Sequence, residues 1–331
     1  MNQVEGIQIR EIATYHPETV RDNDYFEEAF GGKGFLARMI SEDTLGRDKR
    51  FVIKPGSDEN ALTLGIEASK RVLEKAGLKG SDVDMICFCS FTPEYVTPPS
   101  SLIIHNEIGG KDTAFCYDMN VNCAGMLFAV EQLSKYMAAS TGYNRVLVVA
   151  AEALTKMFAP DDIFNQVCFG DCGCALILEK TDDKSKIVDT RVYVESDQIN
   201  LTKSPICGFS NISTAEQKDR YFCFNAPTIT SEKSAHVVLD MLKEHNLEVS
   251  DVKVFLTSQF TKDIGAVYYD TLGVSEEQKK YIGDRYGYTG ANSLFVCMDE
   301  LLEEGKIERG DYVVLWTVGG SMQYIATLIR Y

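Results

Sequence analysis

The sequence predicts an α/β fold in which two similar halves each carry apolar strands packed against helices. Residues 59–78 have the apolar spacing of a helix that ends at a glycine, and residues 81–90 follow as a short link into a buried strand. Residues 231–247 and 250–259 repeat this order about 169 residues later, in a chain of 331 residues. An internal repeat at half of the chain length predicts a duplicated fold.

A second pair of segments repeats at nearly the same offset. Residues 123–139 form a predicted helix that opens with small residues, and residues 145–154 form a predicted buried strand. Residues 289–305 and 311–320 follow the same order in the second half. All of these strands are apolar on both faces, so we expect two parallel-type sheets that are covered by helices on both sides.

The polar stretch at residues 181–190 is the best boundary between the halves. We therefore expect a first half over 1–180, which carries the candidate nucleophile described below, and a second half over 181–331, packed together as one body. Residues 196–232 have weak periodicity and are interpreted as an insertion or loop region, the kind of segment that often controls access to a site.

Charge and apolar runs exclude several classes of function. There are 33 Lys and Arg residues against 49 Asp and Glu residues, for a net charge of −16, which opposes binding to nucleic acid or anionic membranes as the main activity. No apolar run approaches the roughly 18 residues of a membrane-spanning helix, and the N-terminus lacks the apolar core of a signal peptide. Ten cysteines without an export signal predict reduced thiols in the cytoplasm.

One cluster of cysteines resembles a metal site only superficially. Cys168, Cys172 and Cys174 lie close together in the sequence, but alternate residues of a strand face opposite sides of a sheet. Neither a second cluster nor a nearby histidine completes a tetrahedral set of ligands. We therefore expect no metal.

The segment around Cys123 has the pattern of an activated nucleophile. A strand-like run ends at Asn122, and Cys123, Ala124 and Gly125 then open a strongly apolar helix. Backbone N–H groups and the helix dipole at such a position lower the pKa of a thiol, and small neighbours leave room for a substrate. A thioester-forming nucleophile is built in this way. A buried structural cysteine at a tight junction fits the same pattern, and this segment alone does not separate the two interpretations.

The end of the chain supplies a candidate partner for Cys123. Residues 318–321 (Val-Gly-Gly-Ser) follow an apolar strand and predict a sharp turn with free backbone N–H groups. If this turn lay beside Cys123, it could stabilise a developing oxyanion. An ordinary glycine-rich turn is the alternative.

Taken together, these features resemble the thiolase superfamily, and within it β-ketoacyl-[acyl-carrier-protein] synthase III and related condensing enzymes. The segments that carry the resemblance follow the family's order along nearly the whole chain: 92–100, 121–133, 168–178, 286–293, 303–315 and 318–321. The resemblance implies a thiolase-like, duplicated αβαβα layered fold with two mixed sheets. It also implies a dimer, no metal or organic cofactor, and acyl-CoA or an acyl carrier protein as the acyl donor.

The same resemblance assigns roles to individual residues. Cys123 falls on the acylated nucleophile, and Gly320 on the glycine whose N–H forms the oxyanion hole together with the N–H of Cys123. The family's catalytic His falls at Ser258 and its catalytic Asn at Tyr288. Both hydroxyls can donate a hydrogen bond, but neither accepts a proton readily near neutral pH. Losing one oxyanion donor costs about 2.7–4 kcal/mol, so the condensing step is in question.

Other positions bear on the substrate and on a missing base. The four histidines of the chain are interpreted as surface or packing residues: His16, His105, His236 and His245. In the family, a Trp stacks on the coenzyme, and its position falls near Ile40 of this sequence. An aromatic residue that the partner subunit contributes to the acyl pocket falls at Pro98. These differences favour a different acyl donor or a wider pocket. Lys262 could contact a carrier phosphate or an acidic helix, or it could be a solvated lysine.

Three functions are compatible with these residues. The first is a divergent condensing enzyme of fatty acid or secondary-metabolite biosynthesis, which loads an acyl group on Cys123 and extends it. The second is an acyltransferase that passes the group from Cys123 to a hydroxyl, an amine or a thiol without forming a carbon–carbon bond. The third is a catalytically silent subunit of a heterodimeric synthase, although retention of Cys123 and Gly320 counts against it.

Overall fold

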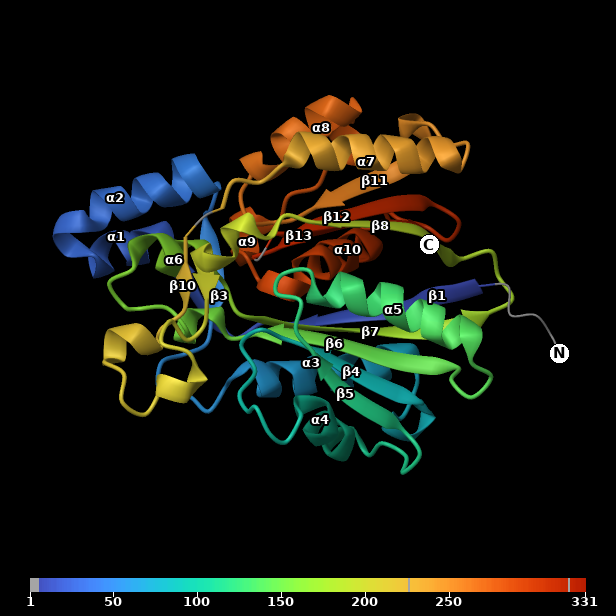
Figure 1. The fold of residues 1–331 in the computed structure, drawn as a ribbon, viewed down its shortest axis with the longest axis horizontal. Coiled ribbons are helices and arrows are strands. Elements are labelled where there is room, and N and C mark those ends of the chain that lie inside the picture. The colour runs from blue at the N-terminus through green and yellow to red at the C-terminus, as the bar shows by residue number, and fades with distance from the viewer. Residues whose placement is uncertain (1–5, 226, 321) are drawn as a thin grey trace.

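The chain folds into five layers in which helices and sheets alternate (Figure 1). The computed structural model describes residues 6–225, 227–320 and 322–331. The first sheet has the strand order β1-β7-β6-β4-β5. Its strands, in that order, are β1 (Gly6–Tyr15), β7 (Cys172–Thr181), β6 (Arg145–Glu152), β4 (Met85–Cys89) and β5 (Phe115–Met119).

The second sheet has the order β11-β12-β13-β8 and repeats most of the first. Its strands are β11 (Val252–Thr257), β12 (Tyr312–Gly319), β13 (Gln323–Arg330) and β8 (Lys186–Val194). Both sheets are mixed, as the resemblance implies: β4 runs parallel to β5 and β6, and β11 runs parallel to β12. The expectation of parallel-type sheets was incomplete, because β7 and β13 return antiparallel to β6 and β12.

Three pairs of helices form the other layers. The first sheet is covered on its outer face by α3 (Ala61–Ala76) and α4 (Ser100–Ile108), and the second sheet by α7 (Ser231–Glu244) and α8 (Ala266–Leu272). Between the sheets lie α5 (Gly125–Ala139) and α10 (Ser293–Glu303). One hydrophobic core joins these two helices to the inner faces of both sheets. Strands with helices on both faces bury both rows of side chains, which explains why their sequences do not alternate.

The repeated Ser-Asp-Val links fold alike in the two halves. Each forms a single turn of 3₁₀-helix, at Gly80–Asp82 and Val249–Asp251. The Asp82 carboxylate accepts from the Lys79 N–H at 2.8 Å, and the Asp251 carboxylate accepts from the Glu248 N–H at 2.7 Å. These side chains cap the turn and direct the chain into β4 and β11, so the sequence repeat reflects a repeated local structure.

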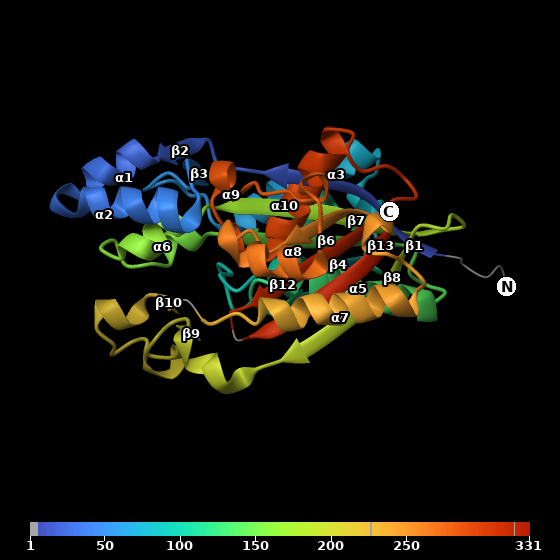
Figure 2. The same cartoon turned by 90° about the horizontal axis from the view of Figure 1, so that it is seen from above.

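The remaining elements gather at one end of the layers, at the left in Figures 1 and 2. They are β2 (Thr19–Asp22), α1 (Asn23–Ala29), α2 (Gly34–Met39), β3 (Lys49–Val52), α6 (Ile163–Cys168), β9 (Thr202–Lys203), β10 (Cys223–Phe224) and α9 (Gly283–Tyr286). The chain passes from the first sheet to the second between Thr181 and Lys186. The division into domains at 180/181 stays a prediction, because both sheets share the central core. No helix in the described ranges has both the length and the apolar character to cross a bilayer.

We expect Gly173→Ala to destabilise the fold by about 1–3 kcal/mol, the usual cost of overpacking a core. A Cβ atom at this position in β7 would lie 2.2 Å from the Leu64 carbonyl oxygen of α3, so the helix would have to move off the sheet. Urea unfolding measures the change. Gly142→Ala is the control, because its nearest neighbour would be the Ser140 Oγ at 3.9 Å, and equal effects of the two variants would contradict the prediction.

Candidate active site

Cys123 lies in the turn between β5 and α5, just before the N-terminus of this central helix. Asn122 has a positive φ of 49°, and the turn is closed by bonds from the Ala124 N–H to the Val121 carbonyl at 3.2 Å and from the Gly125 N–H to the Asn122 carbonyl at 3.0 Å. The helix begins at Gly125, two residues after the predicted start at Cys123, because Cys123 and Ala124 belong to the turn that precedes it. This turn points the thiol toward the second half of the molecule, and the thiol-bearing residue is only 8% exposed.

The glycine turn after β12 meets this cysteine. The backbone N–H groups of Gly320 and of Cys123 itself lie near the Cys123 sulfur and act to lower its pKa. Glycine is needed here because a Cβ at Gly319 would lie 2.9 Å from the Val121 carbonyl oxygen, and one at Gly320 would lie 2.9 Å from the Thr202 Cγ2. Ser321, the last residue of the predicted turn, lies outside the described residues. Two convergent N–H groups beside a thiol are the elements of an oxyanion hole.

Ser258 and Tyr288 complete the polar part of the site. Ser258 directly follows β11 and is 1% exposed, and Tyr288 precedes the turn that leads into α10 and is 2% exposed. The Tyr288 hydroxyl lies at the same cavity as the Cys123 sulfur and acts to lower the pKa of the thiol. Burial raises the pKa of Tyr288 well above its ordinary value, and the nearby Ser258 hydroxyl offsets this only in part. The Ser258 oxygen has no hydrogen-bond partner of ordinary length and angle among the described residues.

Burial dominates the electrostatics of the thiol. It raises the pKa of Cys123 to about 12, and the nearby Glu152 raises it further, whereas the hydrogen bonds from Tyr288, Cys123 and Gly320 lower it. The sequence-based expectation of a lowered thiol pKa is therefore wrong for this conformation. The local donors are present as expected, but desolvation of the thiolate outweighs them.

A small cavity of about 20 Å³ adjoins the thiol, enough for about one water molecule. Cys123, Ser258, Tyr288 and Gly320 all line it. Phe224 and Phe260 line this cavity, and further rings line an adjoining space on another side of Cys123. We call five of these rings the aromatic wall: Phe91, Phe169, Phe222, Phe224 and Phe260. The centroids of neighbouring rings lie between 5.4 Å (Phe224–Phe260) and 6.3 Å (Phe169–Phe260) apart, so these rings pack against each other.

The predicted access segment supplies much of this closure. Phe222, Phe224, Pro227 and Ile229 all line the space around Cys123, and Thr202 packs on Gly320. The interpretation of residues 196–232 as a region that governs access thus agrees with where its side chains lie. In this conformation the segment covers the thiol.

Near the thiol lies a buried carboxyl, Glu152, which the sequence analysis did not identify as a site residue. It ends β6 and accepts from the Ser90 Oγ at 3.0 Å, the Thr92 Oγ1 at 2.6 Å and the Phe91 N–H at 3.3 Å. Burial raises its pKa to about 8. These bonds fix the backbone of Phe91, one ring of the aromatic wall.

Four of the five predicted site residues come together, and one does not. Cys123, Gly320, Ser258 and Tyr288 surround one cavity, whereas Lys262 is exposed and does not line it. The Lys262 N–H contacts the Leu45 carbonyl at 3.4 Å, and its side chain packs near Gly46. Its contact with a carrier stays a prediction.

The histidines and clustered cysteines lie away from the cavity lining. His16 is packed between Phe51 and Tyr286, with ring centroids at 5.0 and 4.6 Å, and burial lowers its pKa to about 4. His105, on α4, contacts the Lys111 carbonyl at 3.0 Å. Across the described ranges, no three His, Cys, Asp or Glu side chains gather closely enough to hold a metal ion.

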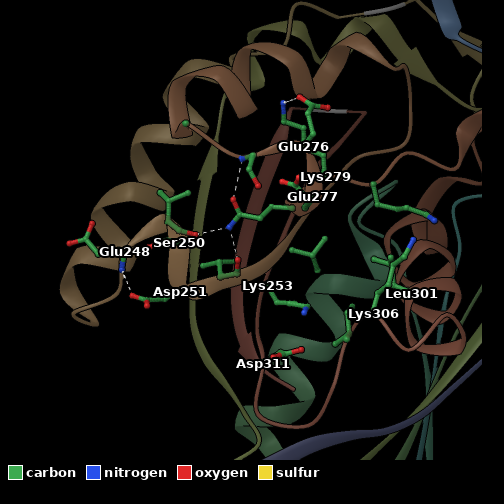
Figure 3. A pocket seen from close by; sticks show the side chains of 18 of the residues that line it. Glu248, Ser250, Asp251, Lys253, Glu276, Glu277, Lys279, Leu301, Lys306 and Asp311 are labelled. Carbon is green, nitrogen blue, oxygen red and sulfur yellow. Dashed lines mark hydrogen bonds and ion pairs between the residues drawn. The ribbon is translucent and has the colours of Figure 1, made fainter.

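A much larger groove of about 1220 Å³ lies at the opposite end of β11 from Ser258 (Figure 3). Its walls carry charged side chains of both signs, including Lys253, Asp311 and the ion pair of Lys279 with Glu276 at 2.6 Å. Size alone therefore does not locate the site. The smaller cavity combines a thiol with N–H and hydroxyl donors, whereas the groove is a solvated surface with no cysteine in its lining.

Two family models match the chain. Residues 117–196 match 3-oxoacyl-[acyl-carrier-protein (ACP)] synthase III, and residues 242–331 match the 3-oxoacyl-[acyl-carrier-protein (ACP)] synthase III C-terminal model. Together the matches span slightly more than half of the sequence and contain all four residues around the cavity.

Curated relatives are similar over nearly the whole chain. The sequence is 25% identical to a β-ketoacyl-[acyl-carrier-protein] synthase III of Clostridium perfringens, across 99% of this chain and 100% of the relative. It is also 25% identical to the enzyme of the same name from Aquifex aeolicus, across 98% of this chain and 100% of the relative.

Solved structures confirm the thiolase-like fold. A 3-oxoacyl-[acyl-carrier-protein] synthase III from Aquifex aeolicus superposes with a TM-score of 0.84 at 23% identity, covering 98% of this chain and 100% of that one. A priming β-ketosynthase of a polyketide biosynthetic pathway gives 0.86 at 22% identity, covering 99% and 97%. An OleA from Xanthomonas campestris, with bound lauric acid and lauroyl-CoA, gives 0.85 at 14% identity, covering 99% and 100%.

We expect alkylation of Cys123 by iodoacetamide to accelerate about tenfold per pH unit up to pH 10 without reaching a plateau, because a thiol with a pKa of about 12 is still mostly protonated there. Tyr288→Phe should lower the rate about tenfold at every pH, because it removes a hydrogen bond to the thiolate. Peptide-resolved mass spectrometry measures both, with Cys123→Ala identifying the labelled peptide. A plateau below pH 9 would show that the thiol is not desolvated as described.

Proposed function

This chain belongs to the 3-oxoacyl-[acyl-carrier-protein] synthase III family of the thiolase superfamily, and from that premise we propose that it is an acyltransferase that forms an acyl thioester on Cys123. Enzymes of this family are acyltransferases that carry out condensation. The observation that carries the proposal is that Cys123, Gly320, Ser258 and Tyr288, from distant parts of the chain, line one small cavity. A thiol, a glycine turn and two hydroxyls at one cavity are the groups that a thioester-forming site uses.

The first step follows from the chemistry of these groups. The Cys123 sulfur attacks the carbonyl carbon of an acyl-CoA or acyl-carrier thioester, and the Cys123 and Gly320 N–H groups stabilise the negative oxygen of the tetrahedral intermediate. The bond between the carbonyl carbon and the donor sulfur then breaks. The proton of the Cys123 thiol goes to the departing thiolate, so the step needs neither a metal nor an organic cofactor.

A substrate can reach the Cys123 thiol only if the access segment, residues 196–232, moves. A cavity of about 20 Å³ cannot hold the end of a coenzyme or carrier arm, and Phe224, Pro227 and Ile229 from the access segment stand in the way. We propose that the segment opens when the donor binds and closes again over the acylated cysteine, which excludes water from the thioester.

For the second step, the Ser258 hydroxyl supports decarboxylative condensation. It is buried, lines the cavity and has no hydrogen-bond partner among the described residues. Together with Tyr288 it can donate to the carbonyl oxygen of a malonyl-type thioester, which becomes the enolate oxygen after CO₂ leaves. The enolate carbon then attacks the acyl carbon and releases Cys123. Fatty acid biosynthesis is the family's setting, and secondary-metabolite biosynthesis is a further candidate.

A second candidate function is acyl transfer without carbon–carbon bond formation. The observation that favours it is the cavity lining, which contains Ser258 and Tyr288 where the family has His and Asn. Transfer to a hydroxyl, an amine or a thiol needs no enolate donor. The third possibility, a silent subunit of a heterodimer, is disfavoured by the intact donors around Cys123.

We also propose that the chain forms a homodimer through the free edge of the first sheet. The edge strand β5 exposes Phe115 to 50%, and neighbouring segments expose Leu102 to 49% and Val96 to 77%. An edge strand beside exposed apolar side chains favours pairing with a second copy. The ten free cysteines fit a reducing compartment, and we place the protein in the cytoplasm.

Incubation with a panel of acyl-CoA and acyl-carrier thioesters should add one acyl group to Cys123, detected by intact-protein mass spectrometry. Cys123→Ala should remove the adduct, and Cys168→Ala, which deletes another buried thiol beside the aromatic wall, should retain it. If no donor labels the protein while a conventional synthase is labelled alongside, the acyltransferase proposal fails. Malonyl thioester added to the adduct then separates the two functions: a 3-ketoacyl product shows condensation, and a persistent adduct that discharges to other acceptors shows transfer.

We expect Phe115→Lys to convert the dimer to a monomer, measured by sedimentation velocity, because a charge placed on the β5 edge opposes pairing. Val192→Lys on the edge strand β8 is the matched control, since Val192 is exposed to 47% but lies on the other sheet. Dissociation by the β8 variant alone would place the interface on the second sheet.

A further inference from the structure

We propose that Arg47 is a positioning residue that holds Ser258 and Tyr288 in place around Cys123, an inference that rests on the function proposed above. Arg47 lies in the segment between α2 and β3, far from Cys123 in the sequence. It is 0% exposed, as is its neighbour Arg50. Burying a charged side chain destabilises the fold unless its donors are hydrogen-bonded. The hydrogen-bond partners of the two arginines therefore show which segments of the chain each one fixes.

Arg47 bonds to the backbone immediately after Ser258. Its Nη2 donates to the Gln259 carbonyl at 3.0 Å and to the Phe260 carbonyl at 2.5 Å. The Gln259 side chain secures the same stretch from the other side, because its Oε1 accepts from the Ile282 N–H at 2.8 Å and its Nε2 donates to the Thr257 carbonyl at 2.9 Å. The backbone on both sides of Ser258 is therefore fixed, which places its unpartnered hydroxyl at the cavity.

The same guanidinium reaches the backbone that carries Tyr288. Its Nε donates to the Cys168 carbonyl at 3.2 Å, and that carbonyl also accepts from the Tyr288 N–H at 3.0 Å. One planar group thus joins the Ser258 segment, the Tyr288 segment and the loop that ends α6. Carbonyl oxygens at separate points suit the forked donors of arginine, and a lysine ammonium cannot reach all of them.

The surroundings of Arg47 are shaped to admit it. Its Nη1 contacts the Tyr281 hydroxyl and the Leu45 carbonyl, the latter at 3.4 Å. A Cβ at Gly283 would lie 2.2 Å from this Nη1, so the glycine leaves the space that the guanidinium occupies.

Arg50 is a matched comparison, because it is equally buried but donates hydrogen bonds to a different set of acceptors. It donates to the Val167 carbonyl at 2.6 Å, the Asn23 Oδ1 at 2.8 Å and the Ser41 Oγ at 2.8 Å. None of these bonds reaches residues 257–262 or 281–288. A role of buried arginines in stability alone would make the two residues equivalent.

The test is the rate of Cys123 alkylation by iodoacetamide from pH 7 to pH 9.5 in folded protein, followed peptide by peptide. Arg47→Lys should lower this rate about tenfold at each pH, as Tyr288→Phe does, because the tyrosine hydroxyl no longer meets the sulfur. The double variant should be no slower than Tyr288→Phe alone, since both changes remove the same contact. Arg50→Lys should lose similar thermal stability and keep the wild-type rate.

A wild-type rate in folded Arg47→Lys, an equal fall in Arg50→Lys, or multiplicative effects in the double variant would each overturn the proposal. If Arg47→Lys does not fold, Gly283→Ala replaces it, because the added methyl displaces the guanidinium without deleting it. Iodoacetamide needs no acyl donor. The alkylation result therefore tests the role of Arg47 even if the chain is never acylated. The panel of acyl thioesters tests the proposed function separately, so the two proposals can fail independently.

Discussion

The site depends on the burial of two helices between two sheets. Because α5 and α10 share one apolar layer with both inner sheet faces, the two halves cannot shift without exposing that layer. Cys123 stands just before α5, and Tyr288 just before the turn into α10. Ser258 and Gly320 follow β11 and β12, which run parallel and therefore end at the same edge of their sheet. Packing of the central layer thus brings four residues from distant parts of the chain to one point.

The dry surroundings of this point have opposing effects on reactivity. Desolvation disfavours the Cys123 thiolate, and the donors at the sulfur only partly offset this. The same low dielectric strengthens the Cys123 and Gly320 N–H groups toward a developing oxyanion. The aromatic wall excludes water that would weaken them. For the acyl transfer proposed above, the geometry therefore favours the transition state over the free thiolate.

Local features of the structure could be predicted from the sequence, and features set by distant contacts could not. The repeated helices and strands follow from apolar spacing and from capping residues such as Gly77, which are encoded within each segment. The turn at Cys123 and the glycines at 319–320 were recognisable for the same reason. The convergence of Ser258 and Tyr288 on the thiol followed only from the family resemblance, because no local pattern links them.

Arg47 and the thiol pKa show where sequence reasoning ends. Arg47 binds backbone carbonyls of Cys168, Gln259 and Phe260, and every residue has a carbonyl, so these partners leave no trace in the sequence. The raised thiol pKa depends on rings that come from separate segments of the chain. The antiparallel return of β7 and β13 was likewise hidden, because buried strands of either direction are equally apolar.

The side chains that cover Cys123 also affect how readily its thiol is oxidised. Peroxides and disulfides attack thiolates that they can reach, and the first product, a sulfenic acid, proceeds irreversibly to higher oxides if nothing reduces it. A thiol that is 8% exposed and almost wholly protonated offers such oxidants little to attack. The covered conformation therefore protects the Cys123 thiol from oxidation, and under the proposed function it keeps that thiol reduced until an acyl donor binds.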